Sequence, residues 1–202
     1  DETPRGWMTF SEVVEHSSNI GTIKIAHHLG EEKFSEYLQA FGFGMKTGVD
    51  LDGESAGSLR SREKWSRRSL VSLAIGHELA VTPLQLIAAA AAVANGGFLM
   101  RPYVVAEVRD GDGSVVAKTT PYVRHRPITA QTSSEMTAIL KRVVSHGTAR
   151  KASLPAHAVS GKTGTAQKID PVLRRYSKDK FVSSFFGFFP ARSPQLIILV
   201  VI

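Results

Sequence analysis

Cysteine is absent from this chain of 202 residues. Its absence excludes a disulfide framework, a thiol nucleophile and a metal site built from cysteine ligands. Long apolar runs are also missing, because the two longest, residues 84–94 and 196–202, are far shorter than the roughly 20 residues that a membrane-spanning helix needs. The sequence therefore predicts neither a cross-linked scaffold nor a membrane span within these residues.

Composition and charge are those of a globular protein. Hydrophobic residues make up 43% of the chain and charged residues 21%, which excludes wholesale disorder. The 25 Lys and Arg residues outnumber the 18 Asp and Glu residues, so the net charge is +7. This balance permits an anionic partner. No basic run with interleaved aromatic residues is present, however, and nucleic acid is not an expected partner.

Helices are expected through most of the chain. Two of them begin with a capping box, at residues 9–12 and 132–135. A third begins at Thr82, where proline at the next position is a strong helix start. Its many alanines indicate close packing on every side, so this helix is expected to be central. The expected helices cover residues 9–16, 20–29, 34–41, 82–95 and 132–147.

Strands are expected mainly at the end of the chain. Residues 103–109 and 114–118 are typical of a hairpin. Three later runs are expected to form one sheet, with the last strand buried: residues 157–167, 181–189 and 196–202. Because helices come first and the sheet last, the pattern predicts an α+β fold. No repeat or linker divides the chain, so residues 1–202 are expected to lie in one domain.

A lysine among small residues stands out on the first strand of this sheet, in the segment Ser-Gly-Lys-Thr-Gly-Thr-Ala at residues 160–166. The small neighbours let a ligand lie against the backbone, and Lys162 can supply a fixed positive charge. Thr163 and Thr165 point to the same face of a strand, where both hydroxyls can meet one ligand carboxylate. The alternative is a solvated edge strand whose lysine opposes aggregation.

A second polar group, Ser17-Ser18-Asn19, lies between two expected helices. Residues two apart do not share a helix face, so Ser17 and Asn19 can converge only in a non-helical turn. Such a turn can direct a hydroxyl and an amide into a cleft. The alternative is that Asn19 is a helix N-cap and the serines only fill the turn.

Ser-x-Asn followed much later by Lys-Thr-Gly on a strand is the pattern of penicillin-recognising serine enzymes. The chain resembles the transpeptidase domain of class B penicillin-binding proteins over nearly its whole length. The order and spacing are similar to the division-specific septal enzyme, and the cell-elongation enzyme is the nearest competitor. The resemblance implies helices packed on a mostly antiparallel sheet, as in serine β-lactamases. Further stretches that carry it are residues 16–22, 41–44, 47–51, 81–86, 147–149 and 184–188.

The resemblance also implies a mechanism. A serine attacks the penultimate D-Ala carbonyl of a peptidoglycan stem peptide and releases the terminal D-Ala. An amine from a neighbouring stem then resolves the acyl-enzyme and forms the cross-link. Ser17 would relay a proton to the leaving nitrogen, and Asn19 would hold the nucleophile's lysine partner and a substrate amide. Lys162 would supply positive charge. The terminal carboxylate would be bound at Thr163, Gly164 and Thr165.

The resemblance extends to ligands and location. It implies that β-lactam antibiotics acylate the same serine, and that neither a metal nor an organic cofactor takes part. It also implies a membrane glycosyltransferase and divisome proteins as partners. The complete protein would be anchored in the inner membrane, with this domain in the periplasm.

The nucleophile of this family lies in a Ser-x-x-Lys element several dozen residues before Ser-x-Asn, and only 16 residues precede Ser17. We therefore expect a chain that is incomplete at both ends, the C-terminal part of a transpeptidase domain, and inactive by itself. Ser61-x-x-Lys64 and Ser177-x-x-Lys180 match the element by chance, in charged sequence after Ser17. A non-catalytic sensor of β-lactams, with the same fold, stays open as an alternative.

A copy of the third motif occurs at Lys46-Thr47-Gly48. It has no second threonine, and the residues after it, 50–53, are typical of a turn. This copy is expected to be a loop. The histidines of the chain, His27, His28 and His77 among them, are not expected to bind metal, because no pattern of carboxylates accompanies them.

Overall fold

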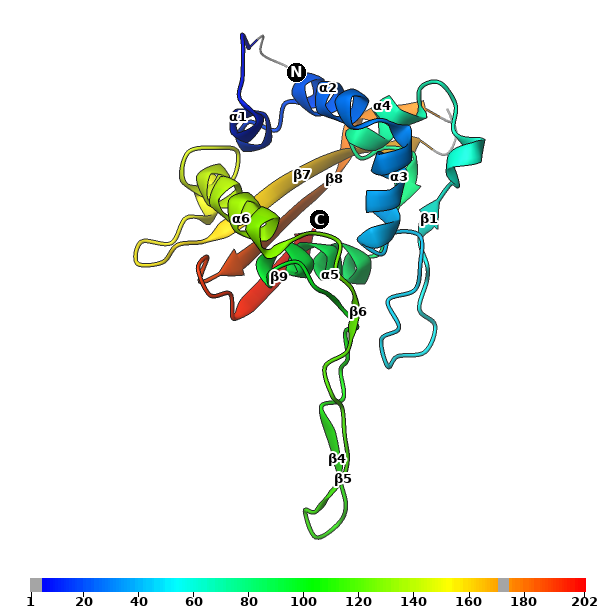
Figure 1. Cartoon of the computed structure of the whole chain (residues 1–202), viewed down its shortest axis with the longest axis vertical. Helices are drawn as coiled ribbons and strands as arrows, with labels where there is room; N and C mark the ends of the chain where they lie inside the picture. Colours follow the sequence, from blue (N-terminus) through cyan, green and yellow to red (C-terminus); the bar gives the residue numbers. More distant parts are fainter. Residues whose placement is uncertain (1–4, 171–174) are drawn as a thin grey trace.

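The computed structural model describes residues 5–170 and 175–202 of the chain (Figure 1). Its α-helices are α1 (Phe10–Glu15), α2 (Asn19–Leu29), α3 (Glu31–Ala40), α4 (Ser69–Ala74), α5 (Pro83–Ala94) and α6 (Ala130–Ser145). Short 3-10 turns are η1 (Arg62–Lys64) and η2 (Arg150–Ala152). Its strands are β1 (Ser58–Leu59), β2 (Leu79–Ala80), β3 (Leu99–Met100), β4 (Glu107–Arg109), β5 (Val115–Lys118), β6 (Val123–His125), β7 (Ser160–Asp170), β8 (Arg175–Phe189) and β9 (Leu196–Val201).

The main sheet has the order β7-β8-β9 and is antiparallel throughout, which confirms the predicted single late sheet and the α+β class. Helices α5 and α6 pack against it. The core between α6 and the sheet is apolar, and at its centre Val143 and Phe188 are almost fully buried. This layer holds β7, the strand of the Lys-Thr-Gly motif, in a fixed position.

Strand β9 differs from the prediction of a buried strand. Leu196, Ile198 and Val200 are exposed, while Ile197 packs on the core. The alternation of exposed and half-buried residues shows that one face of β9 is covered and the other is not. Within the described residues β9 pairs only with β8, so it is also an edge strand. The prediction was wrong because a continuous apolar run does not reveal how many of its faces are covered.

Helix starts follow the predicted signals in two cases out of three. The capping boxes of α1, at Thr9 and Glu12, and of α5, at Thr82 and Gln85, are both present. The capping box predicted at residues 132–135 is wrong. Helix α6 begins three residues earlier, where Thr129 accepts from the backbone N–H of Thr132.

The earlier start of α6 has a packing reason. It places Ser133 inside the first turns of the helix, where its hydroxyl donates to the backbone oxygen of Val93 at 2.6 Å. Helix α5, which ends at Ala94, is therefore tied directly to α6. The buried side chains of α5 include Ala89, Ala90 and Ala92, which confirms the predicted close packing.

The predicted hairpin is present but shorter than expected. Strands β4 and β5 form an arm that extends far from the rest of the molecule (Figure 1). Residues 103–106 stay outside β4, because the carboxylate of Asp50 accepts the backbone N–H groups of Val104 and Val105 at 2.7 and 2.9 Å. At the base of the arm, β6 pairs with β3. The described helices include none that is long and apolar enough to cross a membrane.

Candidate active site

Ser17 occupies an uncommon backbone conformation at the end of α1. The N–H of Ser17 donates to the oxygen of Val14, and the N–H of Ser18 donates to that of Val13, at 3.2 and 3.0 Å. This pair of bonds is a Schellman motif, whose left-handed position is usually filled by glycine. Ser17 holds that position with φ 54°. The predicted non-helical turn is confirmed, and it leaves Ser17 exposed.

The start of α2 corrects the alternative given for Asn19. Ser18, not Asn19, is the N-cap, and its hydroxyl accepts from the N–H of Gly21 at 3.1 Å. Asn19 is the first helical residue and is exposed beside Ser17. A Cβ at Gly21 would clash with the side chain of Val13, so glycine lets α2 pack closely on α1.

Lys162 joins the two motifs. Its Nζ donates to Oγ of Ser17 at 2.8 Å and to the backbone oxygen of Thr163 at 2.9 Å. Ser17 and Lys162 are 145 positions apart in the sequence. Among the described residues β7 is an edge strand, as the alternative required. The lysine of that alternative is not solvated, however, because its side chain is partly buried. This burial lowers the pKa of Lys162 from 10.5 to about 8.

The threonines of the motif lie on one face of β7, where Thr163 is opposite Phe185 and Thr165 is opposite Ser183. Gly164 between them has no room for a side chain, because a Cβ there would lie 2.6 Å from Oγ of Ser184. Thr163 is half-buried and Thr165 is exposed, so a ligand can reach this face of β7. That both hydroxyls meet one carboxylate stays a prediction.

Sequence reasoning missed Thr148 as a neighbour of the site. Its Oγ1 lies 2.9 Å from Oγ1 of Thr163, and either hydroxyl can be the donor. Both residues line a cavity of about 510 Å³ together with Phe185 and residues 149–152. The sequence did contain a signal, Gly-Thr-Ala at residues 147–149, which is one of the stretches that carry the resemblance. That stretch did not predict that Thr148 lies next to Thr163.

The second Lys-Thr-Gly copy is a loop, as predicted. The N–H and hydroxyl of Thr47 both donate to Oε1 of Glu54 at 2.6 Å, and the N–H of Gly48 donates to Oε2 at 3.0 Å. Burial alone would raise the pKa of the Glu54 carboxyl, but these hydrogen bonds outweigh it and lower that pKa. The copy therefore binds a carboxylate of its own chain.

Neither chance match to Ser-x-x-Lys lies on an α-helix. Ser61 precedes the exposed turn η1. Ser177 lies on β8, and its Oγ accepts the N–H groups of Asp179 and Lys180 at 3.2 and 3.1 Å. A serine activated by a lysine one helical turn away needs a helix. The structure therefore agrees with the rejection of both serines.

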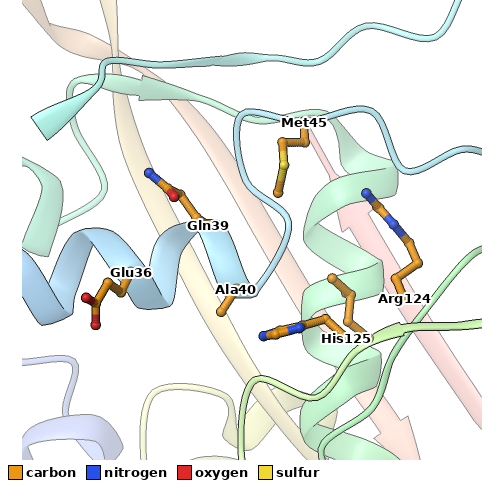
Figure 2. Close-up of a pocket in the computed structure, with 7 residues that line it drawn as sticks. Glu36, Gln39, Ala40, Met45, Arg124 and His125 are labelled. Carbon is orange, nitrogen blue, oxygen red and sulfur yellow. The ribbon is translucent and has the colours of Figure 1, made fainter.

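Another cavity lies away from the motifs, between α3, the chain after it and the β3–β6 pair (Figure 2). Its volume is about 390 Å³, and Figure 2 shows Arg124 and His125 entering it from β6. Its remaining lining residues are Glu36, Gln39, Ala40, Met45 and Leu99. In the part of the chain that the structure describes, no three His, Asp or Glu side chains gather as metal ligands.

The lowered pKa of Lys162 predicts a pH dependence. We expect acylation of the complete protein by a penicillin to slow as the pH rises through about 8, because Lys162 then loses its charge and attracts the penicillin carboxylate less. The second-order acylation rate is measured from about pH 6 to about pH 10. In Lys162→Arg the alkaline fall is expected to disappear, because a guanidinium stays charged up to about pH 12. An equal fall in both proteins would contradict the prediction.

A helical layer on an antiparallel sheet, with Ser-x-Asn in a turn and Lys-Thr-Gly on the facing strand, defines the class of penicillin-recognising serine enzymes. Comparison with protein families agrees with this class. The model of the penicillin-binding protein transpeptidase domain matches residues 1–202. The chain belongs to this family.

Known relatives cover nearly all of the chain. Stage V sporulation protein D of Bacillus subtilis (strain 168) is 38% identical over 198 residues, which are 98% of this chain and 30% of that protein. The probable peptidoglycan D,D-transpeptidase FtsI of Caulobacter vibrioides is 38% identical over 190 residues, which are 93% of this chain and 30% of that protein. The chain thus spans about 30% of the length of these relatives.

Solved structures confirm the fold. Penicillin-binding protein 3 of Mycobacterium tuberculosis, complexed with ampicillin, superposes with a TM-score of 0.94 at 33% identity, covering 100% of this chain and 46% of that chain. Its complex with aztreonam gives a TM-score of 0.93. The predicted transpeptidase fold, with helices on an antiparallel sheet, is confirmed.

Proposed function

We propose that the complete protein is a peptidoglycan D,D-transpeptidase that cross-links stem peptides through a serine acyl-enzyme, and that residues 1–202 are the C-terminal part of its transpeptidase domain. The observation that carries the proposal is the 2.8 Å hydrogen bond from Lys162 to Ser17, which brings two sequence-distant motifs into one site. Membership of the family and the names of the relatives support the same activity.

In this proposal the nucleophile belongs to a Ser-x-x-Lys element before Ser17, and the residues of this chain complete the site around it. Ser17 relays a proton to the leaving nitrogen, and Asn19 orients the lysine of that element and a substrate amide. Lys162 attracts the terminal carboxylate of the stem peptide. The carboxylate is bound along β7 by Thr163, Gly164 and Thr165, and the N–H of Thr165 supports the oxyanion.

β-Lactam antibiotics are proposed ligands of the same site. The ampicillin and aztreonam complexes of the M. tuberculosis protein support this proposal. Ampicillin carries a carboxylate next to the nitrogen of its reactive lactam, and aztreonam carries a sulfonate on that nitrogen. In the proposal the charge of Lys162 attracts either anion, as it attracts the terminal carboxylate of the stem peptide. No cofactor is proposed. The proposed setting is septal cell-wall synthesis, with the domain in the periplasm, an inner-membrane anchor, and a membrane glycosyltransferase and divisome proteins as partners.

A direct assay tests the proposed activity. The complete protein is incubated with a stem peptide ending in D-Ala-D-Ala and with an acceptor amine, and released D-Ala and cross-linked product are measured. A fluorescent penicillin counts the reactive sites in parallel. We expect both D-Ala release and stoichiometric labelling. Labelling without D-Ala release would instead support the non-catalytic sensor. The absence of both labelling and D-Ala release would overturn the proposal.

The 202-residue chain by itself is expected not to react with penicillin. The physical reason is that Ser61 and Ser177 lie outside α-helices, so neither has the lysine of its Ser-x-x-Lys match one helical turn away. Intact-mass spectrometry after incubation with a penicillin measures the adduct, and the complete protein is the positive control. A stoichiometric adduct on the 202-residue chain would contradict the prediction, and peptide mapping would then identify the reactive serine.

A further inference from the structure

The last residue of α1 is an acid in an unfavourable place. Glu15 is only 5% exposed, and it lies at a helix end where carbonyl oxygens leave partial negative charge. A buried carboxylate is costly unless it is paired. The partner is Arg142 in the last turn of α6, whose Nε lies 3.0 Å from Oε2 of Glu15. The pair therefore joins the C-terminal ends of α1 and α6.

The segment that follows α6 also contacts Glu15, through a backbone hydrogen bond. The N–H of Thr148 donates to the backbone oxygen of Glu15 at 3.3 Å. Gly147 permits this approach, because a Cβ there would clash with that oxygen. Two independent contacts, one ionic and one of the backbone, thus fix Glu15 against residues 142–148.

Residues 142–148 also contact the strand of the other motif. Oγ1 of Thr148 lies 2.9 Å from Oγ1 of Thr163, the neighbour of Lys162. Ser17, two positions after Glu15, and Lys162 are therefore linked by two routes. One is their own hydrogen bond, and the other runs from Glu15 through Thr148 to β7.

The left-handed backbone of Ser17 needs such support, because a strained conformation persists only where the surrounding structure determines it. We propose that Glu15 and Arg142 are positioning residues, which hold the end of α1 so that the hydroxyl of Ser17 meets Lys162. The inference rests on the proposed function, in which Ser17 and Lys162 belong to the reacting site. Neither Glu15 nor Arg142 touches the substrate in this account.

The test is a double-mutant cycle in the complete protein. Glu15→Gln has nearly the same shape and removes the buried charge, so the protein is expected to fold. We expect the maximal rate of acylation by benzylpenicillin to fall by about tenfold, with little change in the affinity of the non-covalent complex. Arg142→Gln is expected to have the same effect, and the two substitutions together no more than one. Arg142→Gln leaves the buried Glu15 carboxylate without its ionic partner, so the unfolding temperature of each variant is measured beside its acylation rate, and the rates are compared at a temperature at which every variant is folded.

Ser17→Gly separates positioning from general support of the fold. If Glu15 acts through the hydroxyl of Ser17, then adding Glu15→Gln to Ser17→Gly lowers the residual rate by less than about twofold. Lys141→Gln is the matched control, because it removes an exposed charge from the same turn of α6 and leaves the rate unchanged. A tenfold loss in the Ser17→Gly background, or a wild-type rate in Glu15→Gln, overturns this inference alone. A wild-type protein that penicillin does not acylate overturns the proposed function and this inference with it.

Discussion

Replacing Lys162 by alanine in the complete protein is expected to slow acylation by a penicillin by roughly ten- to a hundred-and-fifty-fold. The substitution removes the positive charge of Lys162. That charge faces Ser17 and, in the proposed mechanism, it also faces the carboxylate of the ligand. A charge-assisted contact in a partly dry site contributes about 1.5–3 kcal/mol, and each 1.36 kcal/mol is about a factor of ten in rate. The measurement is the second-order rate constant of acylation.

Lys46→Ala is the matched control, because it alters the same motif in the other copy. Lys46 is exposed in a loop, where water screens its charge. Its loss is expected to change acylation by less than about twofold. If Lys46→Ala slowed the reaction as much as Lys162→Ala, the choice of β7 as the ligand strand would be wrong.

Ser17→Gly is expected to separate stability from reactivity. Glycine adopts the left-handed backbone of the Schellman motif without the penalty that serine carries, so the domain is expected to become more stable by about 1 kcal/mol. The same substitution removes the proposed proton relay, and acylation is expected to fall by about 10²- to 10⁴-fold. Thermal unfolding and acylation kinetics of the complete protein measure the two effects.

Ser17→Ala completes this comparison. Alanine also lacks the hydroxyl, but its Cβ retains the strain at positive φ. It is therefore expected to lose as much reactivity as Ser17→Gly and to gain no stability. Wild-type acylation in Ser17→Gly would show that the hydroxyl takes no part in the reaction. Both variants lose the hydrogen bond from Lys162, so an unfolding temperature of Ser17→Gly no higher than that of Ser17→Ala would show that the turn does not store strain.

The sequence predicted helices and strands well where residues close in the sequence determine them. The capping box at Thr9 and the N-cap with proline at Thr82 depend only on residues within three positions, and both are present. The start of α6 was predicted wrongly because the hydroxyl of Thr129, not that of Thr132, caps the helix. Ser133 then lies within the helix and donates to Val93 of α5, a contact that the local sequence does not reveal. Likewise, the first residues of the hairpin bond to Asp50, more than 50 positions away.

In the site, too, features set by residues close in the sequence could be predicted, and features set by tertiary contacts could not. The motifs around Ser17 and Lys162 could be found in the sequence, and the turn at Ser17 could be argued from spacing alone. Their meeting depends on tertiary packing, so only the family resemblance predicted it. Thr148 was missed because its bonds to Glu15 and Thr163 exist only in the folded chain.

The two Lys-Thr-Gly copies also differ in what a carboxylate in solution would have to displace. Glu54 is tethered a few residues from Thr47, so its effective concentration at that loop is in the millimolar range or above. A dissolved acid at lower concentration cannot compete there. Among the described residues no carboxylate is bonded to Thr163 or Thr165, so an acid arriving at β7 meets no intramolecular rival. Selectivity between identical triplets thus arises from the rest of the chain.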